Sequence, residues 1–152
     1  MKNIKTIVSS EPLSIEKAIN FVQNPAHGAI DTFIGTVRNH HNGKEVTGIT
    51  YDVHKNLAEK MLQDICLEAH NLWPKTNYFV AHRYDVLEIG EQSIIIAVSA
   101  PHRDESFKAC RYVIEEIKKH APVWKKEHYI DGKSEWLPGH SLTTTKHTSI
   151  PS

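Results

Sequence analysis

The sequence predicts an α+β domain of two layers, in which a mixed or antiparallel sheet with hairpins packs against about three helices. Its patterns follow the order strand, helix, strand, strand, helix, strand, strand, helix, strand, so hairpins alternate with single helices. The chain has no glycine-rich phosphate loop of the kind found in doubly wound folds. A sheet built from repeated parallel βαβ units is therefore disfavoured.

Helical spacing of apolar residues predicts helices over 15–23, 55–72 and 104–119. Ser14 is suited to begin the first helix, because its hydroxyl can accept a hydrogen bond from a backbone N–H of the first turn. Each segment is followed within a few residues by a proline, which cannot continue a helix. The prolines therefore mark the C-terminal limits of the helices.

Segments rich in β-branched residues predict strands over 3–9, 28–38, 46–53, 77–86, 92–100 and 123–130. Asn42-Gly43 lies between the second and third of these segments and is a strong turn signal. We therefore expect those two strands to form a hairpin with a long polar tip. The 92–100 strand is apolar enough to be buried on both faces of its sheet.

Length and composition predict one domain, residues 1–136, followed by a polar tail, residues 137–152, that is flexible or ordered by a partner. The net charge of zero disfavours broad attraction to nucleic acid or to an acidic membrane. The chain has neither a membrane-length apolar run nor a signal-peptide pattern. Cys66 and Cys110 lie in helical patterns and are expected to be buried thiols, so we expect a cytoplasmic protein.

The chain has 11 histidines, which raises the hypothesis of a metal site. They are scattered, however, and none forms the i, i+4 pair of a helical zinc site. No Cys-x-x-Cys motif is present either. We therefore expect no structural or catalytic metal, and a metal-dependent hydrolase lacks the ligand spacing that it would need.

Lys118 lies at the margin of the apolar face of the 104–119 helix, close to Ile114 on a helical wheel. Lys119 points to solvent on the same wheel. A partly desolvated lysine has a lowered pKa and becomes useful as an acid or base near neutrality. The alternative is a lysine whose aliphatic stem covers the edge of the core while its ammonium stays in water.

The segment after Pro122 alternates like a strand, so that Lys125 and Glu127 share one face if Trp124 faces the core. Such a pair is ordinarily a solvated ion pair. If that face lines a cleft instead, the turn at Pro122 brings Lys125 to Lys118.

His102 and Arg103 follow the most apolar strand and precede a helix. A helix N-terminus with an adjacent arginine and histidine suits a phosphate or carboxylate, although an ordinary polar loop has the same local sequence. Arg38, in Thr36-Val37-Arg38, is another arginine at the end of a strand. Taken together, these residues predict a basic pocket for an anionic small molecule.

Several stretches then resemble one family, the large, catalytic subunits of molybdopterin synthase, which act in molybdenum-cofactor biosynthesis. They are 28–40, Gly43 and Val46, 81–83 (Ala-His-Arg), 87–91 (Leu-Glu-Ile-Gly-Glu), 102–103 with 107–109, and 118–127, which ends in Trp-Lys-Lys-Glu. Each piece is weak by itself, but together they cover residues 3–136 in order and with compact spacing.

The resemblance implies an α+β fold and a homodimer in which each large subunit binds one small, ubiquitin-like sulfur-carrier subunit. The reaction converts cyclic pyranopterin monophosphate to molybdopterin, with two dithiolene sulfurs delivered by the small subunit's C-terminal thiocarboxylate. No cofactor is implied, because the small subunit supplies the sulfur. The family's catalytic lysines correspond to Lys118 and Lys125. Its substrate contacts correspond to Thr36, Val37, Arg38, His102, Arg103, Lys118, Lys125, Lys126 and Glu127.

The alternative to an enzyme is a non-catalytic scaffold that binds an anionic ligand or a ubiquitin-like partner. The presence of both lysines favours the enzyme, since a scaffold would be free to lose them. The family's tail past Trp136 often adds basic contacts near the active site. Here that tail is rich in serine and threonine, with Lys146 and His147 as its charged or titratable residues beyond His140.

Overall fold

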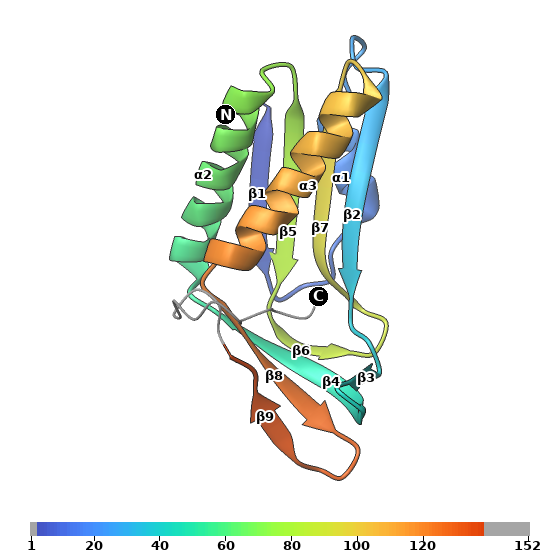
Figure 1. Ribbon diagram of the computed structural model, residues 1–152, viewed down its shortest axis with the longest axis vertical. Helices are drawn as coiled ribbons and strands as arrows, with labels where there is room; N and C mark the ends of the chain where they lie inside the picture. Colours follow the sequence, from blue (N-terminus) through green and yellow to red (C-terminus); the bar gives the residue numbers. More distant parts are fainter. Residues whose placement is uncertain (1–2, 139–152) are drawn as a thin grey trace.

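The computed structural model describes residues 3–138, which form three helices and two sheets (Figure 1). The elements are β1 (Ile4–Ser9), α1 (Ile15–Val22), β2 (Ala29–Thr36), β3 (His40–His41), β4 (Lys44–Val53), α2 (Lys55–Leu72), β5 (Asn77–Arg83), β6 (Asp85–Glu88), β7 (Gln92–Ala100), α3 (Arg103–His120), β8 (Val123–Tyr129) and β9 (Ser134–Trp136). The predicted α+β class is confirmed. The predicted tail lies outside the described residues from 139 onward.

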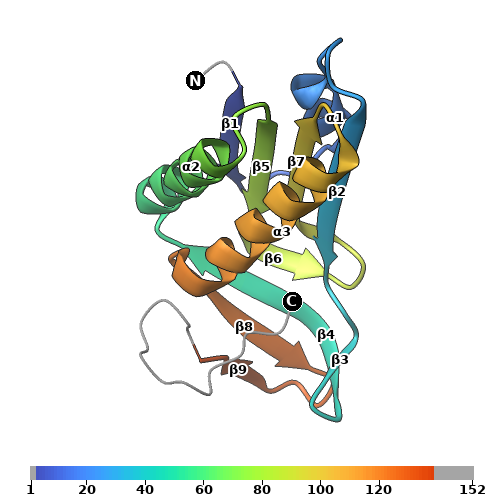
Figure 2. The ribbon, with the colours of Figure 1, turned by 45° about the horizontal axis from the view of Figure 1, so that its top comes forward.

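The first sheet has the strand order β1-β5-β7-β2. β1 and β5 are parallel, and the other neighbours are antiparallel. Helices α2 and α3 cover one face of this sheet, and α1 packs on β5 and β7 from the other face (Figures 1 and 2). All nine residues of the central strand β7 are buried except the first, which is half-buried, as its apolar sequence predicted.

The second sheet lies at one end of the first and is built around β4. β4 pairs with β6 on one side and with β8 on the other, and β9 continues the sheet beyond β8. The short strand β3 folds back on the beginning of β4. The second sheet has no helix of its own among the elements that the structure describes, so α3 meets it only at its C-terminal end (Figure 1).

The three predicted helices are confirmed within one residue at each end. Ser14 caps α1 as expected, since its Oγ accepts a hydrogen bond from the backbone N–H of Lys17 at 3.2 Å. α3 ends at His120, and Ala121 and Pro122 lead directly into β8. Helix α3 therefore ends just before Pro122, as the sequence predicted.

The predicted hairpin between 28–38 and 46–53 is wrong, because those segments belong to different sheets. β2 pairs along its length with β7, and β4 pairs with β8. A central strand buried on both faces needs an apolar neighbour on each edge, and β2 supplies one for β7. The turn at Asn42 and Gly43 exists, with φ of 51° and 77°, but it closes only the short hairpin of β3 with β4.

The predicted strand 77–86 is also corrected, since it is divided between the two sheets. β5 ends at Arg83, and β6 begins at Asp85, whose φ of 78° is in the left-handed region. The backbone turns there and carries the chain from the first sheet to the second. Apolar residues continue beyond the turn at Val86 and Leu87, so the sequence pattern did not show it. The short strand β9 was likewise not predicted.

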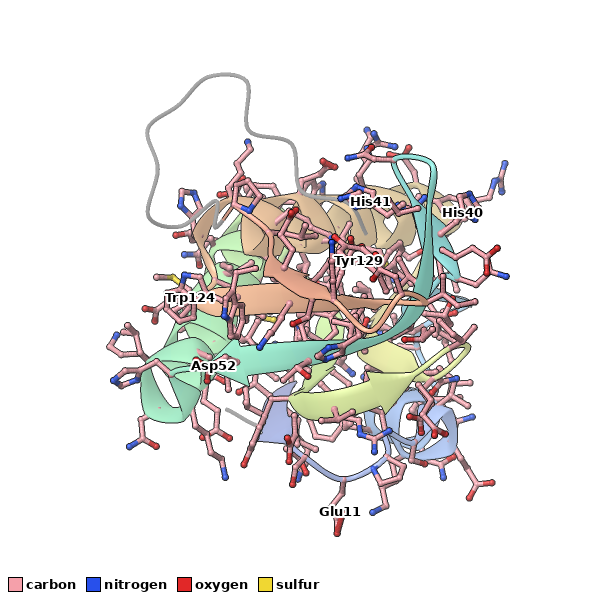
Figure 3. All side chains as sticks on the ribbon, turned by 90° about the horizontal axis from the view of Figure 1, so that it is seen from below. Glu11, His40, His41, Asp52, Trp124 and Tyr129 are labelled. Carbon is pink, nitrogen blue, oxygen red and sulfur yellow. The ribbon has the colours of Figure 1, made fainter. Side chains whose placement is uncertain are left out.

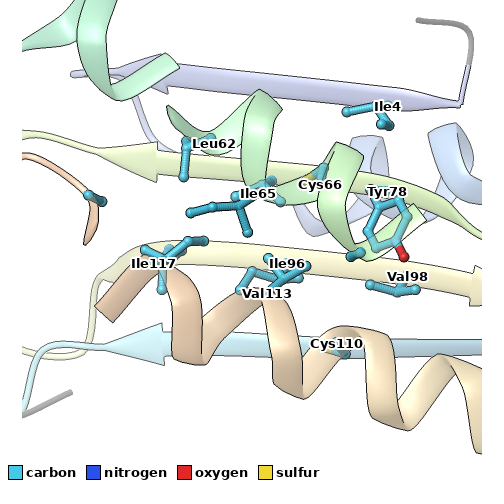
Figure 4. Packing of buried hydrophobic residues seen from close by; sticks show 14 of the residues in the cluster. Ile4, Leu62, Ile65, Cys66, Tyr78, Ile96, Val98, Cys110, Val113 and Ile117 are labelled. Carbon is cyan, nitrogen blue, oxygen red and sulfur yellow. The ribbon is translucent and has the colours of Figure 1, made fainter. Parts of the chain in front are cut away.

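The main core lies between the first sheet and helices α2 and α3 (Figure 4). Tyr78, Leu62, Ile65, Ile96 and Val113 are among its fully buried side chains. A smaller cluster joins the second sheet to the first; it consists of Val37, Val46, Ile49, Tyr51 and Leu87. The junction between the sheets is therefore packed, and side chains there are held in place from both sides.

Truncation of the central strand should test this core. Ile96 is 0% exposed, so Ile96→Ala should lower the free energy of unfolding by about 2–5 kcal/mol, through lost burial and the cavity left behind. Val86→Ala on β6 is the matched control, because Val86 is 60% exposed and should change it by less than about 1 kcal/mol. Denaturant unfolding measures both, and equal effects would contradict this description of the core.

Candidate active site

The candidate site lies at the junction of the two sheets, where three segments cross from the first to the second. One crossing follows β2, one follows β5, and one follows α3. Thr36 and His82 are close to the ends of β2 and β5, opposite the beginning of β7. Lys118 lies in the last turn of α3 at the same end of the sheet (Figure 1).

The turn after α3 brings Lys118 and Lys125 to one place. Lys118 is half-buried at the end of α3, whereas Lys119 is exposed, as the helical wheel predicted. Lys125 lies on β8 opposite Tyr51 of β4 and is only 7% exposed. The solvated ion pair that the sequence left open is therefore excluded, and Lys125 lies near Lys118.

Both lysines have pKa values below the ordinary value for the side chain. Burial is the main cause in each case, because it penalises the charged ammonium. Burial together with the nearby charge of Lys118 lowers the pKa of Lys125 to about 8, against the opposing effect of Glu127. The Arg38 guanidinium also lowers the pKa of both lysines. Three cationic groups from three segments therefore lie near one another here.

Arg38 and its neighbours form the crossing after β2. Val37 is buried, and its backbone is fixed by hydrogen bonds of 3.0 Å to the Glu91 carbonyl and 2.8 Å from the Gly90 N–H. Thr36 and Arg38 are exposed on either side of it. An anchored Val37 between two exposed residues holds the Arg38 backbone at the junction while the guanidinium can reach a ligand.

Glu127 is brought to the junction but is enclosed by protein. It is 3% exposed and shares the inner face of β8 with Lys125. Its Oε1 lies 2.9 Å from Nδ1 of His41 and accepts a hydrogen bond from the Tyr129 hydroxyl at 3.1 Å. A carboxylate held in this way is poorly placed to touch an anionic substrate directly.

His82 is a further residue of the junction that the sequence analysis did not name as a site residue. It is 8% exposed, its Nδ1 lies 2.9 Å from the Arg83 carbonyl, and its ring meets that of Tyr51 edge-on. Burial, with a smaller contribution from Lys118, lowers the pKa of His82 to about 4. A carbonyl accepts only from a protonated nitrogen, so the neutral ring carries its proton on Nδ1. The signal in the sequence was its position two residues after Val80, on the core face of β5.

Lys126 does not join this group. It alternates with Lys125 on β8, so its side chain points to the opposite face of the second sheet. There its Nζ lies 5.5 Å from the ring centre of Trp136, which pairs with it across β9. Cation–π contact with an exposed tryptophan is a sufficient physical account of its position.

His102 and Arg103 do not join it either. They are exposed at the N-terminal end of α3, following the end of β7 as predicted. Arg103 and Lys118 are roughly 22 Å apart along an axis that rises about 1.5 Å per residue. Within one chain, therefore, the predicted contacts form two groups at opposite ends of α3.

Residues 3–138 contain no group of three or more His, Cys, Asp or Glu side chains arranged to hold a metal ion. Over the same range, no helix is both long and apolar enough to cross a membrane.

The sequence and the fold match known proteins of one class. A family model described as MoaE protein matches residues 8–120. The molybdopterin synthase catalytic subunit of Synechococcus elongatus is 42% identical over 136 residues, 89% of this chain and 82% of that one. That of Halalkalibacterium halodurans is 41% identical over 147 residues, 97% and 93% of the two chains.

Solved structures agree with these relatives. A crystal structure of molybdopterin synthase from Staphylococcus aureus has a TM-score of 0.83 and 36% identity, and it covers 91% of this chain and 98% of that one. A structure from Helicobacter pylori, a complex of subunits 1 and 2 of molybdopterin-converting factor, has a TM-score of 0.68 at 22% identity, which shows the fold alone; it covers 91% and 92% of the two chains.

The chain therefore belongs to the MoaE protein family. Its function is that of a molybdopterin synthase catalytic subunit, an enzyme of molybdenum-cofactor biosynthesis.

The lowered pKa of Lys125 should appear in the pH dependence of stability. Unfolded, Lys125 has its ordinary pKa of 10.5, and folded it has about 8, so between these values the unfolded chain binds more protons. The free energy of unfolding therefore rises with pH in that window. Lys125→Met removes this contribution, on the order of 2 kcal/mol. In denaturant unfolding, the free energy of unfolding of the wild type should increase relative to that of Lys125→Met between pH 8 and pH 10. A constant difference between the two proteins would contradict the lowered pKa of Lys125.

Proposed function

We propose that Arg38, Lys118 and Lys125 form the centre at which cyclic pyranopterin monophosphate is converted to molybdopterin. The observation that carries this proposal is the meeting of three cations at the junction, where Arg38 lowers the pKa of both lysines and Lys118 lowers that of Lys125. Cationic groups that repel one another while partly desolvated favour the binding of an anion. A phosphate ester of small size is such a ligand.

The sulfur comes, in this proposal, from the C-terminal thiocarboxylate of a small ubiquitin-like subunit. A thiocarboxylate is already a good nucleophile, so the large subunit need not supply one. Cys66 and Cys110 fit this, because both are buried and burial raises the pKa of each to about 12. Free, buried thiols also fit a cytoplasmic location, where such groups stay reduced.

The two lysines take different roles in the proposal. Lys125, with a pKa near 8, exchanges its proton readily at neutral pH and serves as the acid or base for the leaving oxygens. Lys118 and Arg38 stabilise negative charge as the cyclic phosphate opens. Lys126 and Glu127 are left out of the contact set, because one points away and the other is enclosed.

The small subunit is proposed to approach this junction. Its C-terminal tail must reach the lysines, and Thr36 and Arg38 are the exposed residues beside them. The Helicobacter pylori structure, which shares the fold, is a complex of two different subunits and supports a partner of this kind. A scaffold would bind the same tail without turnover, so product formation separates the two functions.

The homodimer is proposed because it accounts for His102 and Arg103. They lie too far from Lys118 of their own chain to contact the same small substrate. In a closed dimer, the same residues of a second large subunit can complete the site. Each site would then combine the junction of one chain with the α3 N-terminus of the other.

Substitution of the paired lysines tests the enzyme. With a thiocarboxylated small subunit and the cyclic pterin, Lys118→Ala and Lys125→Ala should each lower the rate of molybdopterin formation about 100-fold or more. The exposed neighbour gives a matched control, since Lys119→Ala removes an equal charge one residue away and should keep its activity. Undiminished turnover in both lysine variants, with the fold intact, would refute the catalytic assignment.

Mixed dimers test the shared site. Lys118→Ala and Arg103→Ala should each be inactive as homodimers. When the two are unfolded together and refolded, a heterodimer has one complete site and one doubly defective site. Random mixing should therefore restore roughly a quarter of wild-type activity. Mixtures that stay inactive, although size-exclusion chromatography shows dimers, would place both residues in one chain's site, and an active Arg103→Ala homodimer would exclude Arg103.

A further inference from the structure

Glu127 is the feature of the junction that the proposed reaction does not use. Its carboxylate is 4% exposed, which is costly for a charge unless neighbouring groups donate hydrogen bonds to it. Two groups meet the same oxygen: Nδ1 of His41 at 2.9 Å and the Tyr129 hydroxyl at 3.1 Å. Both contacts depend on one carboxylate orientation, so together they fix it.

His41 reaches Glu127 from a separate element. It belongs to β3, which precedes the Asn42-Gly43 turn, and its side chain is only 14% exposed. Figure 3 shows His41 near Tyr129, at the inner side of the hairpin, with His40 farther along its outer side. His40 is exposed, and its Nδ1 lies 3.1 Å from the side-chain oxygen of the neighbouring Asn39. The two adjacent histidines therefore have different surroundings.

Glu127 and Lys125 are two residues apart on the inner face of β8, and both are buried. Around Lys125 the charged and titratable groups are Lys118 on α3, Arg38 after β2, Tyr51 on β4 and Glu127 on β8. Lys118 and Arg38 lower the pKa of Lys125, and Glu127 raises it. Around Tyr129 stand Lys44, Asp131 and Glu135.

We propose that His41 is a positioning residue of this site: together with Tyr129, it holds the Glu127 carboxylate in place as the counter-charge of Lys125. Tyr129 remains a donor at neutral pH, because burial and the hydrogen bond to Glu127 raise its pKa to about 12. The effect on catalysis rests on the proposed function; the hydrogen-bonded arrangement and its effect on Lys125 do not.

The arrangement balances two opposing requirements. Without a counter-charge, the neighbouring cations and burial would lower the pKa of Lys125 further and favour its uncharged form. Without the hydrogen bonds from His41 and Tyr129, more of the carboxylate charge would act on Lys125 and its proton would be held more firmly. Donors from His41 and Tyr129 occupy Oε1 and hold the carboxylate in one orientation, so its charge acts on Lys125 from a constant position.

The ionisation of Lys125 measures this directly and needs no activity. Carbon-13 NMR of lysine Cε follows its titration in the free protein, with the resonance assigned by its loss in Lys125→Arg. Glu127→Gln keeps the acceptor but removes the charge, so the Lys125 midpoint should fall by about one pH unit. His41→Ala frees the carboxylate and admits water, and both effects should raise the midpoint by roughly half a unit.

Two further variants make the result independent of a folding defect. Tyr129→Phe removes only a hydroxyl and should shift the midpoint in the same direction as His41→Ala. His41→Asn places an amide N–H where Nδ1 stood and should return the midpoint toward wild type. His40→Ala is the matched control and should leave it in place. Thermal unfolding checks that each protein is folded.

An unshifted Lys125 in Glu127→Gln overturns the role of the counter-charge. An unshifted or lowered midpoint in both His41→Ala and Tyr129→Phe overturns the positioning role of His41. In the reconstituted reaction, His41→Ala should lower kcat several-fold at unchanged KM, with partial recovery in His41→Asn. If the wild type makes no product while the NMR shifts appear as expected, the proposed function fails and the positioning role stands.

Discussion

The cost of burying two lysines beside each other is the constraint on which the junction depends. A desolvated ammonium is unfavourable, and a second one close by makes it more so. Lys125 is 7% exposed and has Lys118 and Arg38 as cationic neighbours. The fold bears this cost because large clusters on both sides hold the backbone, and because Glu127 supplies the opposite charge. Stability is given up locally at the residue that we propose as the acid or base of the reaction.

The junction exists because the chain leaves the first sheet three times at the same end. Each exit has a local cause: an irregular register between Gly35 and Thr36, a left-handed Asp85, and Pro122 after the last turn of α3. These three segments place Arg38, the beginning of β6 and the Lys118–Lys125 pair in one region. No single element could present these residues together, since strands alternate their faces and helices rotate theirs.

Much of the fold and of the candidate site could be predicted from the sequence, and the predictions that were wrong share one cause. The helices, the Ser14 cap and the separation of Lys118 from Lys119 follow from local periodicity, which reports how a segment buries one face. The partner of a strand is not local information. The Asn42-Gly43 turn correctly predicted a reversal but not that β2 pairs with β7 instead of β4. For the same reason the pattern could not show that His41 meets Glu127, 86 residues away in the chain.

The balance of charge in the site also limits what it can bind. The chain as a whole has no net charge, so its long-range field does not gather polyanions. Three cations lie near one another at the junction, so the local charge there suits the small anion that we propose as substrate. His82 would add a fourth cation if it were protonated, but burial lowers its pKa to about 4 and its Nδ1 is committed to the Arg83 carbonyl. A neutral histidine near Lys118 adds no repulsion to the cations of the proposed site.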